Sequence, residues 1–177
     1  MRSELDLPAR ALIGQNSQVL RQGLALLDQI DDRLYVGVSK PLFNYGVGSH
    51  FRHSLDSYQC FLSGVKTGRI DYDQRERDAL IESNRVRARA RIELTIEQLE
   101  RETLTDSSSE LQSRQDSPHW TASSVQRELQ FLLSHTIHHY ALIALMLRVQ
   151  GFSPATGFGV APSTLEYWQK EDELCVQ

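Results

Sequence analysis

The chain has 177 residues, 40% hydrophobic and 24% charged, which is typical of one globular domain. Its net charge of −4 offers no overall attraction for nucleic acid or an anionic membrane. The longest apolar run, ALIALML, is much shorter than the roughly 20 residues of a membrane span, and the N-terminal residues lack the apolar segment of a signal peptide. Cys60 and Cys175 stand far apart, as in a reduced cytoplasmic protein, and Cys60 is expected to be a small buried hydrophobe.

Four long segments carry apolar residues at the three- and four-residue spacing of amphipathic helices. The first three cover about residues 8–31, 47–65 and 73–101. The fourth is capped by Thr121, Ser123 or Ser124 and ends near Gly151. The intervening residues, about 31–46, 66–72 and 105–119, are predicted to form loops and turns because they are rich in Gly, Pro and polar residues.

No segment alternates with period two for long, so the predicted fold class is all-α, a four-helix bundle in a single domain over residues 1–177. The bundle covers about residues 8–151. The tail, residues 152–177, is expected to pack on it and to end in a short amphipathic helix from about Ser163. Leu165 and Trp168 are its predicted docking residues.

The fourth helix contains HTIHH, and its helical wheel places three histidines differently. A core-facing arc contains Val125, Leu129, Leu132, Thr136, Tyr140, Ile143 and Leu147. His139 lies at the edge of that arc and His135 lies one turn earlier on the same flank, whereas His138 points outward. Imidazoles four residues apart on a helix can bind one metal ion.

The second helix carries two further histidines, His50 and His53, either of which could supply a third imidazole. The wheel does not decide between them, although His50 is nearer the centre of the apolar face. Three protein ligands leave coordination positions open, as in a catalytic metal site. The alternative is that the histidines are core residues satisfied by hydrogen bonds.

Two motifs, VGSHFRHSLDSY and HTIHHYALIALMLRVQG, resemble the second- and fourth-helix motifs of the DinB/YfiT-like superfamily of metalloenzymes. The resemblance covers about residues 8–151 and implies a four-helix bundle with a long crossover connection. It also implies that His53, His135 and His139 bind the metal. On this basis His50 becomes a second-shell residue, and His138 a neighbour that is not a ligand.

The resemblance implies a small-molecule substrate, and for some members a low-molecular-weight thiol that is joined to an electrophile; other members are related to hydrolases or isomerases. It also implies a homodimer. Imidazole ligands favour zinc or nickel, with iron or manganese as further options. The competing hypothesis is a non-catalytic dimerising helical module with a structural or vestigial metal site.

Other polar residues near these motifs are secondary candidates. Asp56 could orient an imidazole and Glu128 could act in the second shell or in proton transfer, although an exposed carboxylate is the plainer interpretation of each. Anion binding is one interpretation of Arg69, Tyr72, Arg75 and Arg77; the favoured alternative is a solvated helix start capped by Asp71 or Asp73. Arg85, Arg87, Arg89 and Arg91 are expected to form a solvated, ion-paired face rather than a nucleic-acid site.

Overall fold

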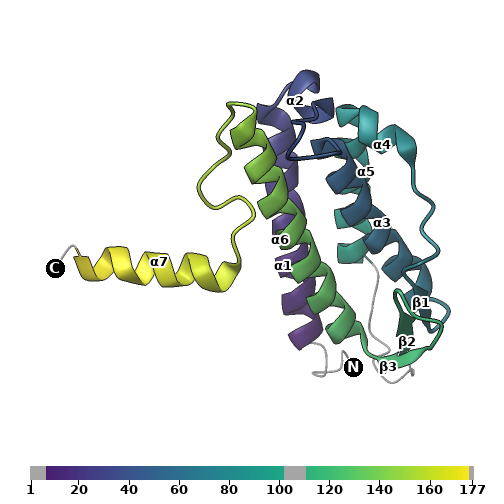
Figure 1. Ribbon diagram of the computed structural model, residues 1–177. Helices are drawn as coiled ribbons and strands as arrows, with labels where there is room; N and C mark the ends of the chain where they lie inside the picture. The colour runs from purple at the N-terminus through teal and green to yellow at the C-terminus, as the bar shows by residue number, and fades with distance from the viewer. Residues whose placement is uncertain (1–6, 102–110, 176–177) are drawn as a thin grey trace.

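Four long helices form the body of the molecule in the computed structural model, which describes residues 7–101 and 111–175 (Figure 1). They are α1 (Leu7–Gln29), α3 (Val47–Val65), α5 (Arg85–Arg101) and α6 (Val125–Val149). α1 and α3 each pack against both α5 and α6, so α1 lies diagonally opposite α3. The chain therefore crosses the bundle between α1 and α3, and again between α5 and α6, which explains the long connections. The predicted four-helix core is confirmed.

The all-α prediction is wrong in detail, because the described residues also form a small sheet. Its strands are β1 (Arg69–Asp71), β2 (Leu111–Arg114) and β3 (Thr121–Ser123). β1 pairs with β2 in parallel, with Arg69 opposite Gln112, and β2 pairs with β3 in antiparallel orientation. The sheet joins the end of α3 to the start of α6, and so replaces part of the predicted turn and surface loop. Residues 105–110 of that loop lie outside the described part of the chain.

The predicted third helix is interrupted and begins later than expected. Residues 74–78 have no regular structure, α4 covers Ala79–Ser83, and α5 starts after Asn84. The side chain of Asp78 accepts a hydrogen bond from the Leu80 amide, so Asp78 caps α4 in place of Asp71 or Asp73. The Asn84 side chain accepts from the amide of Arg87 at the start of α5. A further short helix, α2 (Asp32–Val36), lies in the predicted first loop.

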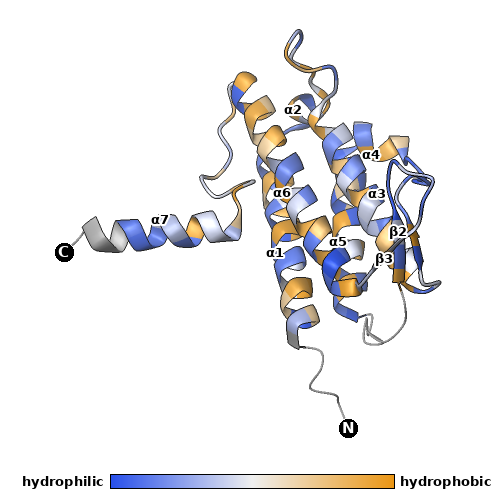
Figure 2. Cartoon of the chain, turned by 60° about the horizontal axis from the view of Figure 1, so that its bottom comes forward, coloured by the Kyte–Doolittle hydropathy of each residue, from blue (hydrophilic) through white to orange (hydrophobic). Residues whose placement is uncertain are grey.

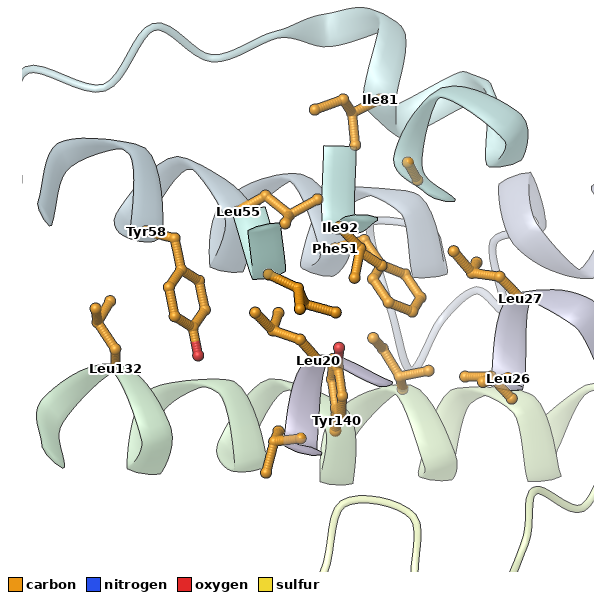
Figure 3. Packing of buried hydrophobic residues seen from close by; sticks show 14 of the residues in the cluster. Leu20, Leu26, Leu27, Phe51, Leu55, Tyr58, Ile81, Ile92, Leu132 and Tyr140 are labelled. Atoms are coloured by element: carbon orange, nitrogen blue, oxygen red, sulfur yellow. The ribbon is translucent and has the colours of Figure 1, made fainter. Parts of the chain in front are cut away.

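The core lies between the four long helices and is built mainly from large apolar residues (Figure 3). Hydrophobic and hydrophilic residues alternate along these helices, as amphipathic packing requires (Figure 2). One polar cluster is buried among them. The Tyr58 hydroxyl donates to Asn16 Oδ1 at 2.7 Å and lies 3.2 Å from Thr136 Oγ1, and Asn16 Nδ2 donates to the Leu129 carbonyl at 3.0 Å. These contacts fix the register of α1, α3 and α6.

α6 follows its predicted boundaries. Ser124 is the N-cap, and its hydroxyl accepts from the Arg127 amide. The core-facing arc is buried from Leu129 to Leu147, and His138 is exposed. None of the helices within the described residues is both long and apolar enough to cross a membrane.

The C-terminal segment divides into a docked loop and a projecting helix. Phe158 stacks on Tyr140 with ring centroids 4.8 Å apart, and Gly159, at φ +73°, lies directly against the α6 backbone at Ala141. The helix α7 (Pro162–Cys175) extends away from the bundle (Figure 1). Leu165 lines a small cavity together with Leu26 of α1 and Gly157 of the loop, as a docking residue would, but Trp168 is 41% exposed. Docking through Trp168 is therefore not observed.

Candidate metal centre

Three histidines from α3 and α6 point their Nε2 atoms at one place. His53 Nε2 lies 3.2 Å from His135 Nε2, and His135 Nε2 lies 3.1 Å from His139 Nε2. One ligand atom from each of the three lies within 4.8 Å of those of the other two. The packed helices α3 and α6 create this convergence because α6 presents two histidines four residues apart on one flank and α3 presents one histidine to them. The structure thus brings together the three predicted ligands.

The spacing of these nitrogens fits one transition metal ion. Zinc–imidazole bonds of about 2.0–2.1 Å, at angles between octahedral and tetrahedral, place two ligand nitrogens about 2.9–3.4 Å apart. The distances of 3.2 and 3.1 Å both fall in that range. A set of three protein ligands on one side of an ion leaves its other positions open.

Hydrogen bonds among the three imidazoles do not satisfy all of their ring nitrogens. An imidazole Nε2 carries either one proton or one lone pair, yet His135 Nε2 is approached by both His53 and His139. The other ring nitrogen, His135 Nδ1, is buried without a hydrogen-bond partner. A single cation among the three Nε2 atoms would satisfy all three lone pairs at once, so the donor set fits a metal.

Burial keeps the cluster in the form that binds metals. It lowers the pKa of His53 to about 4, helped by the neighbouring His135 and by Arg75. It lowers the pKa of His135 to about 4 and that of His139 to about 2, with nearby histidines adding to the effect. The three imidazoles are therefore neutral at pH 7, and neutral imidazole is the ligand form.

His50 lies on the far side of His139 from the converging Nε2 atoms. Its Nδ1 is 3.0 Å from His139 Nδ1, so it contacts the nitrogen that a metal at Nε2 leaves free. This is the position of a residue that orients a ligand. His50 thus contacts one predicted ligand, His139, and the roles of His53 as a ligand and His50 as its neighbour stay predictions.

Aromatic rings surround the cluster on α6. Phe131 stacks on His135 with ring centroids 5.3 Å apart and an interplanar angle of 21°. The exposed His138 meets His139 edge to face at 5.2 Å and adds no nitrogen to the converging group. Phe131 was missed by the sequence analysis, although its position four residues before His135 placed it on the same flank.

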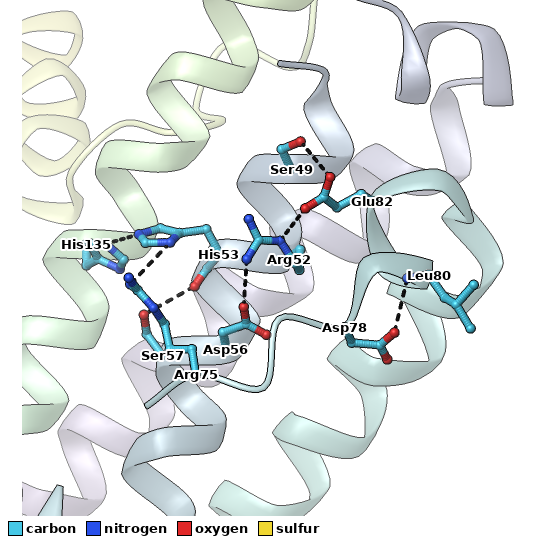
Figure 4. Close-up of polar contacts among 10 residues, drawn as sticks. All are labelled: Ser49, Arg52, His53, Asp56, Ser57, Arg75, Asp78, Leu80, Glu82 and His135. Carbon is cyan, nitrogen blue, oxygen red and sulfur yellow. Dashed lines mark hydrogen bonds and ion pairs between the residues drawn. The ribbon is translucent and has the colours of Figure 1, made fainter. Parts of the chain in front are cut away.

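Asp56 does not orient an imidazole. Its carboxylate accepts from Arg52 at 3.0 Å, and Arg52 also pairs with Glu82 at 2.6 Å (Figure 4). Asp56 is only 7% exposed, so the plainer interpretation as an exposed carboxylate is also wrong. Its role is to neutralise a partly buried arginine beside the cluster.

Glu128 is fully buried and belongs to a different contact network. Its Oε2 accepts from the Tyr72 hydroxyl at 2.7 Å, and its Oε1 accepts from the Ser123 hydroxyl. Phe131 packs against Tyr72 with centroids 5.1 Å apart and lies between this network and His135. Glu128 therefore ties β3 and the segment after β1 to α6, and none of the histidines is its partner.

The four residues considered for anion binding separate in the structure. Arg75 reaches the cluster, with Nη1 3.3 Å from His53 Nδ1 (Figure 4). Tyr72 is buried and its hydroxyl donates to Glu128, whereas Arg77 is exposed. The Cζ atom of Arg69 lies 5.4 Å from the centroid of the Trp120 ring. The solvated-helix interpretation therefore fails for Arg75.

Arg85, Arg87, Arg89 and Arg91, in the first half of α5, are paired with acids, as predicted. Arg85 pairs with Asp32 at 2.9 Å. The remaining pairs are Arg87 with Asp78, Arg89 with Asp28 and Glu93, and Arg91 with Asp78 at 3.7 Å. Each positive charge of this face has a carboxylate neighbour, which removes the electrostatic basis for a nucleic-acid site.

A separate cavity of about 290 Å³ lies between α3, β1 and the segment before α4. Cys60, Gln59 and Gln74 are among its lining residues, and the three converging histidines are not. Burial raises the pKa of the Cys60 thiol to about 11, so it is not a thiolate at neutral pH. Cys60 packs against the core as predicted, although it is half-buried rather than buried.

Comparison with known proteins finds one partial similarity. The chain is 33% identical over 108 residues to FK506-binding protein 5 from Rhizopus delemar, a match that covers 58% of this chain and 28% of that protein. The matched part is thus a small fraction of the relative, and its name describes the relative alone. No protein-family model matches the chain. No solved structure matches it.

Proposed function

We propose that this protein is a metal-dependent enzyme of the DinB/YfiT-like kind, with His53, His135 and His139 as ligands of a divalent transition metal. The observation that supports the proposal most strongly is the convergence of three Nε2 atoms from two core helices. Zinc or nickel suits three imidazoles best, and iron or manganese is compatible with them.

The proposed reaction is the transfer of a low-molecular-weight thiol to a small electrophile, or hydrolysis of such a substrate. A bound divalent metal would supply Lewis acidity, which lowers the pKa of a thiol or water at its open positions. The chain itself would hold the imidazoles neutral through burial and fix the His139 ring through His50. It would also limit water access, because the ligands are half-buried.

The proposal is tested by measuring formation of the carbon–sulfur bond. Protein loaded with zinc or nickel is mixed with a small thiol and an electrophilic chloroarene, and the thioether is quantified. We expect turnover that is lost in chelator-treated protein and in His135→Gln, and retained in His138→Gln, which changes an exposed neighbour. Equal rates with and without metal would contradict the proposal.

A second candidate is a dimerising helical module in which the metal is structural. It is favoured by apolar residues that are exposed near the C-terminal end of α6 and in the middle of α7, namely Leu145, Val149, Tyr167 and Trp168. Light scattering coupled to gel filtration measures the oligomeric state. A dimer that binds metal but shows no thiol-transfer or hydrolytic activity would favour this candidate.

A further inference from the structure

Arg75 differs from the other arginine beside the cluster in having no acid partner. Arg52 is neutralised by Asp56 and Glu82. Among the described residues no carboxylate pairs with Arg75; its Nη1 contacts His53 Nδ1 at 3.3 Å, and its Nε is buried without a hydrogen-bond partner. A half-buried guanidinium with unused donors is costly unless an acceptor arrives from outside the chain.

The contact between Arg75 and His53 is incompatible with a metal at His53 Nε2. A guanidinium only donates hydrogen bonds, so His53 Nδ1 must present a lone pair to Arg75. A neutral imidazole that gives its Nε2 lone pair to a metal carries its proton on Nδ1. With a metal at His53 Nε2, the Nδ1–H group of His53 would therefore face the N–H groups of Arg75, and both are donors. Arg75 would then have no hydrogen-bond acceptor on His53.

The charges around the cluster lead to the same conclusion. Three neutral imidazoles bring no negative charge to a divalent cation, and Arg75 adds a positive one. The nearby carboxylates bond elsewhere, Asp56 and Glu82 to Arg52 and Glu128 to two hydroxyls, so none of these three forms an ion pair with Arg75. A divalent cation beside Arg75 would therefore have no carboxylate in direct contact with either positive charge, and an anionic ligand would supply one.

We propose that Arg75 is the substrate-recognition residue of the site and binds a carboxylate group of the substrate beside the metal. A planar guanidinium presents paired donors that match a carboxylate. One guanidinium suits a singly charged carboxylate better than a phosphate dianion, which needs more donors. This inference rests on the proposed metal centre, and it assigns a substrate class to that centre.

The test uses cobalt(II) as a spectroscopic metal and acetate as the probe. Cobalt-loaded protein is titrated with acetate while its visible absorption is recorded, with neutral acetamide and inorganic phosphate in parallel. The variants are Arg75→Gln and Arg75→Lys, and the matched control is Arg77→Gln, an exposed arginine two residues further along. Cobalt content is measured for every sample.

We expect acetate to change the wild-type spectrum at lower concentration than acetamide or phosphate. The acetate dissociation constant should increase about 10-fold in Arg75→Gln and less in Arg75→Lys, and stay unchanged in Arg77→Gln. Equal acetate affinity in fully loaded wild type and Arg75→Gln would overturn the inference and leave the metal centre standing. Tighter binding of phosphate than of acetate would also overturn the assignment to carboxylates. Failure of the wild type to bind cobalt would refute the metal centre, and the inference with it.

Discussion

His50 and His53 lie almost one turn apart on α3 and face different nitrogens of the α6 histidines. His53 Nε2 joins the converging group, whereas His50 Nδ1 contacts only the outer nitrogen of His139. We therefore expect His53→Gln to abolish tight metal binding and His50→Gln to weaken it about 10- to 100-fold, the usual effect of losing a second-shell partner. Competition with a coloured chelator measures both affinities. A larger loss in His50→Gln than in His53→Gln would reverse the assignment.

Glu128 is predicted to matter for stability rather than for metal binding. Glu128→Ala removes the acceptor of the buried Tyr72 hydroxyl and the half-buried Ser123 hydroxyl and leaves a cavity, which should lower the free energy of unfolding by about 2–4 kcal/mol. Tyr72→Phe, which removes only one hydroxyl, should cost about 1 kcal/mol. Denaturant titration gives both values, and metal affinity is measured on the same samples. A stable Glu128→Ala protein that no longer binds metal would contradict this interpretation.

At the scale of single residues, the sequence predicted some parts of the site and not others. The pair His135 and His139 follows from helical geometry, because four-residue spacing places both imidazoles on one flank. The Asp56–Arg52 pair on α3 also has four-residue spacing, but the contacts of Glu128 and Arg75 do not follow in this way. They involve the segment after β1 and strand β3, and helix periodicity carries no information on where such segments pack.

At the scale of elements, close backbone contacts make particular glycines necessary. A Cβ at Gly48 on α3 would collide with the Glu82 carbonyl of the neighbouring α4, whereas a Cβ at Gly14 on α1 meets nothing within 4 Å. We expect Gly48→Ala to cost about 2–3 kcal/mol, because backbone cannot yield as a side chain can. Gly14→Ala should stabilise the helix by up to about 1 kcal/mol. Thermal unfolding of both variants measures the difference, and similar melting temperatures would show that α3 and α4 pack less closely.

The elements that sequence analysis missed are short and depend on distant partners. Each strand has three or four residues, too few to show alternation, and β1 pairs with a strand some 40 residues away. The start of α4 depends on Asp78 as a cap and the break between α4 and α5 on Asn84, but acidic residues and asparagine are also common on exposed helix faces. The long helices, by contrast, were predictable because their apolar spacing extends over several turns.

At the scale of the whole molecule, the histidine cluster links stability to pH. The pKa values of His53 and His135 are about 4 in the folded protein, below the ordinary value of 6.5 that the unfolded chain retains. The unfolded state thus binds more protons between pH 6.5 and 4. The free energy of unfolding of metal-free protein should therefore decrease as the pH falls from 6.5 to 4. Above pH 6.5, His53 and His135 should not change it.

Denaturant titrations of metal-free protein at several pH values measure this dependence. His135→Gln should reduce the slope of stability against pH between 6.5 and 4, because one of the groups responsible is removed. His119→Gln, a change at an exposed loop residue, serves as the control and should retain the wild-type slope. An unchanged slope in His135→Gln would mean that burial of this histidine contributes nothing to the pH dependence.

The most direct test of the metal centre is the metal content of the untagged protein by elemental mass spectrometry, before and after incubation with zinc or nickel. Wild type and His138→Gln should contain close to one transition metal ion per chain. His135→Gln should contain almost none while keeping its helical circular dichroism. No metal in wild type after incubation, or equal metal in His135→Gln, would contradict the three-histidine centre.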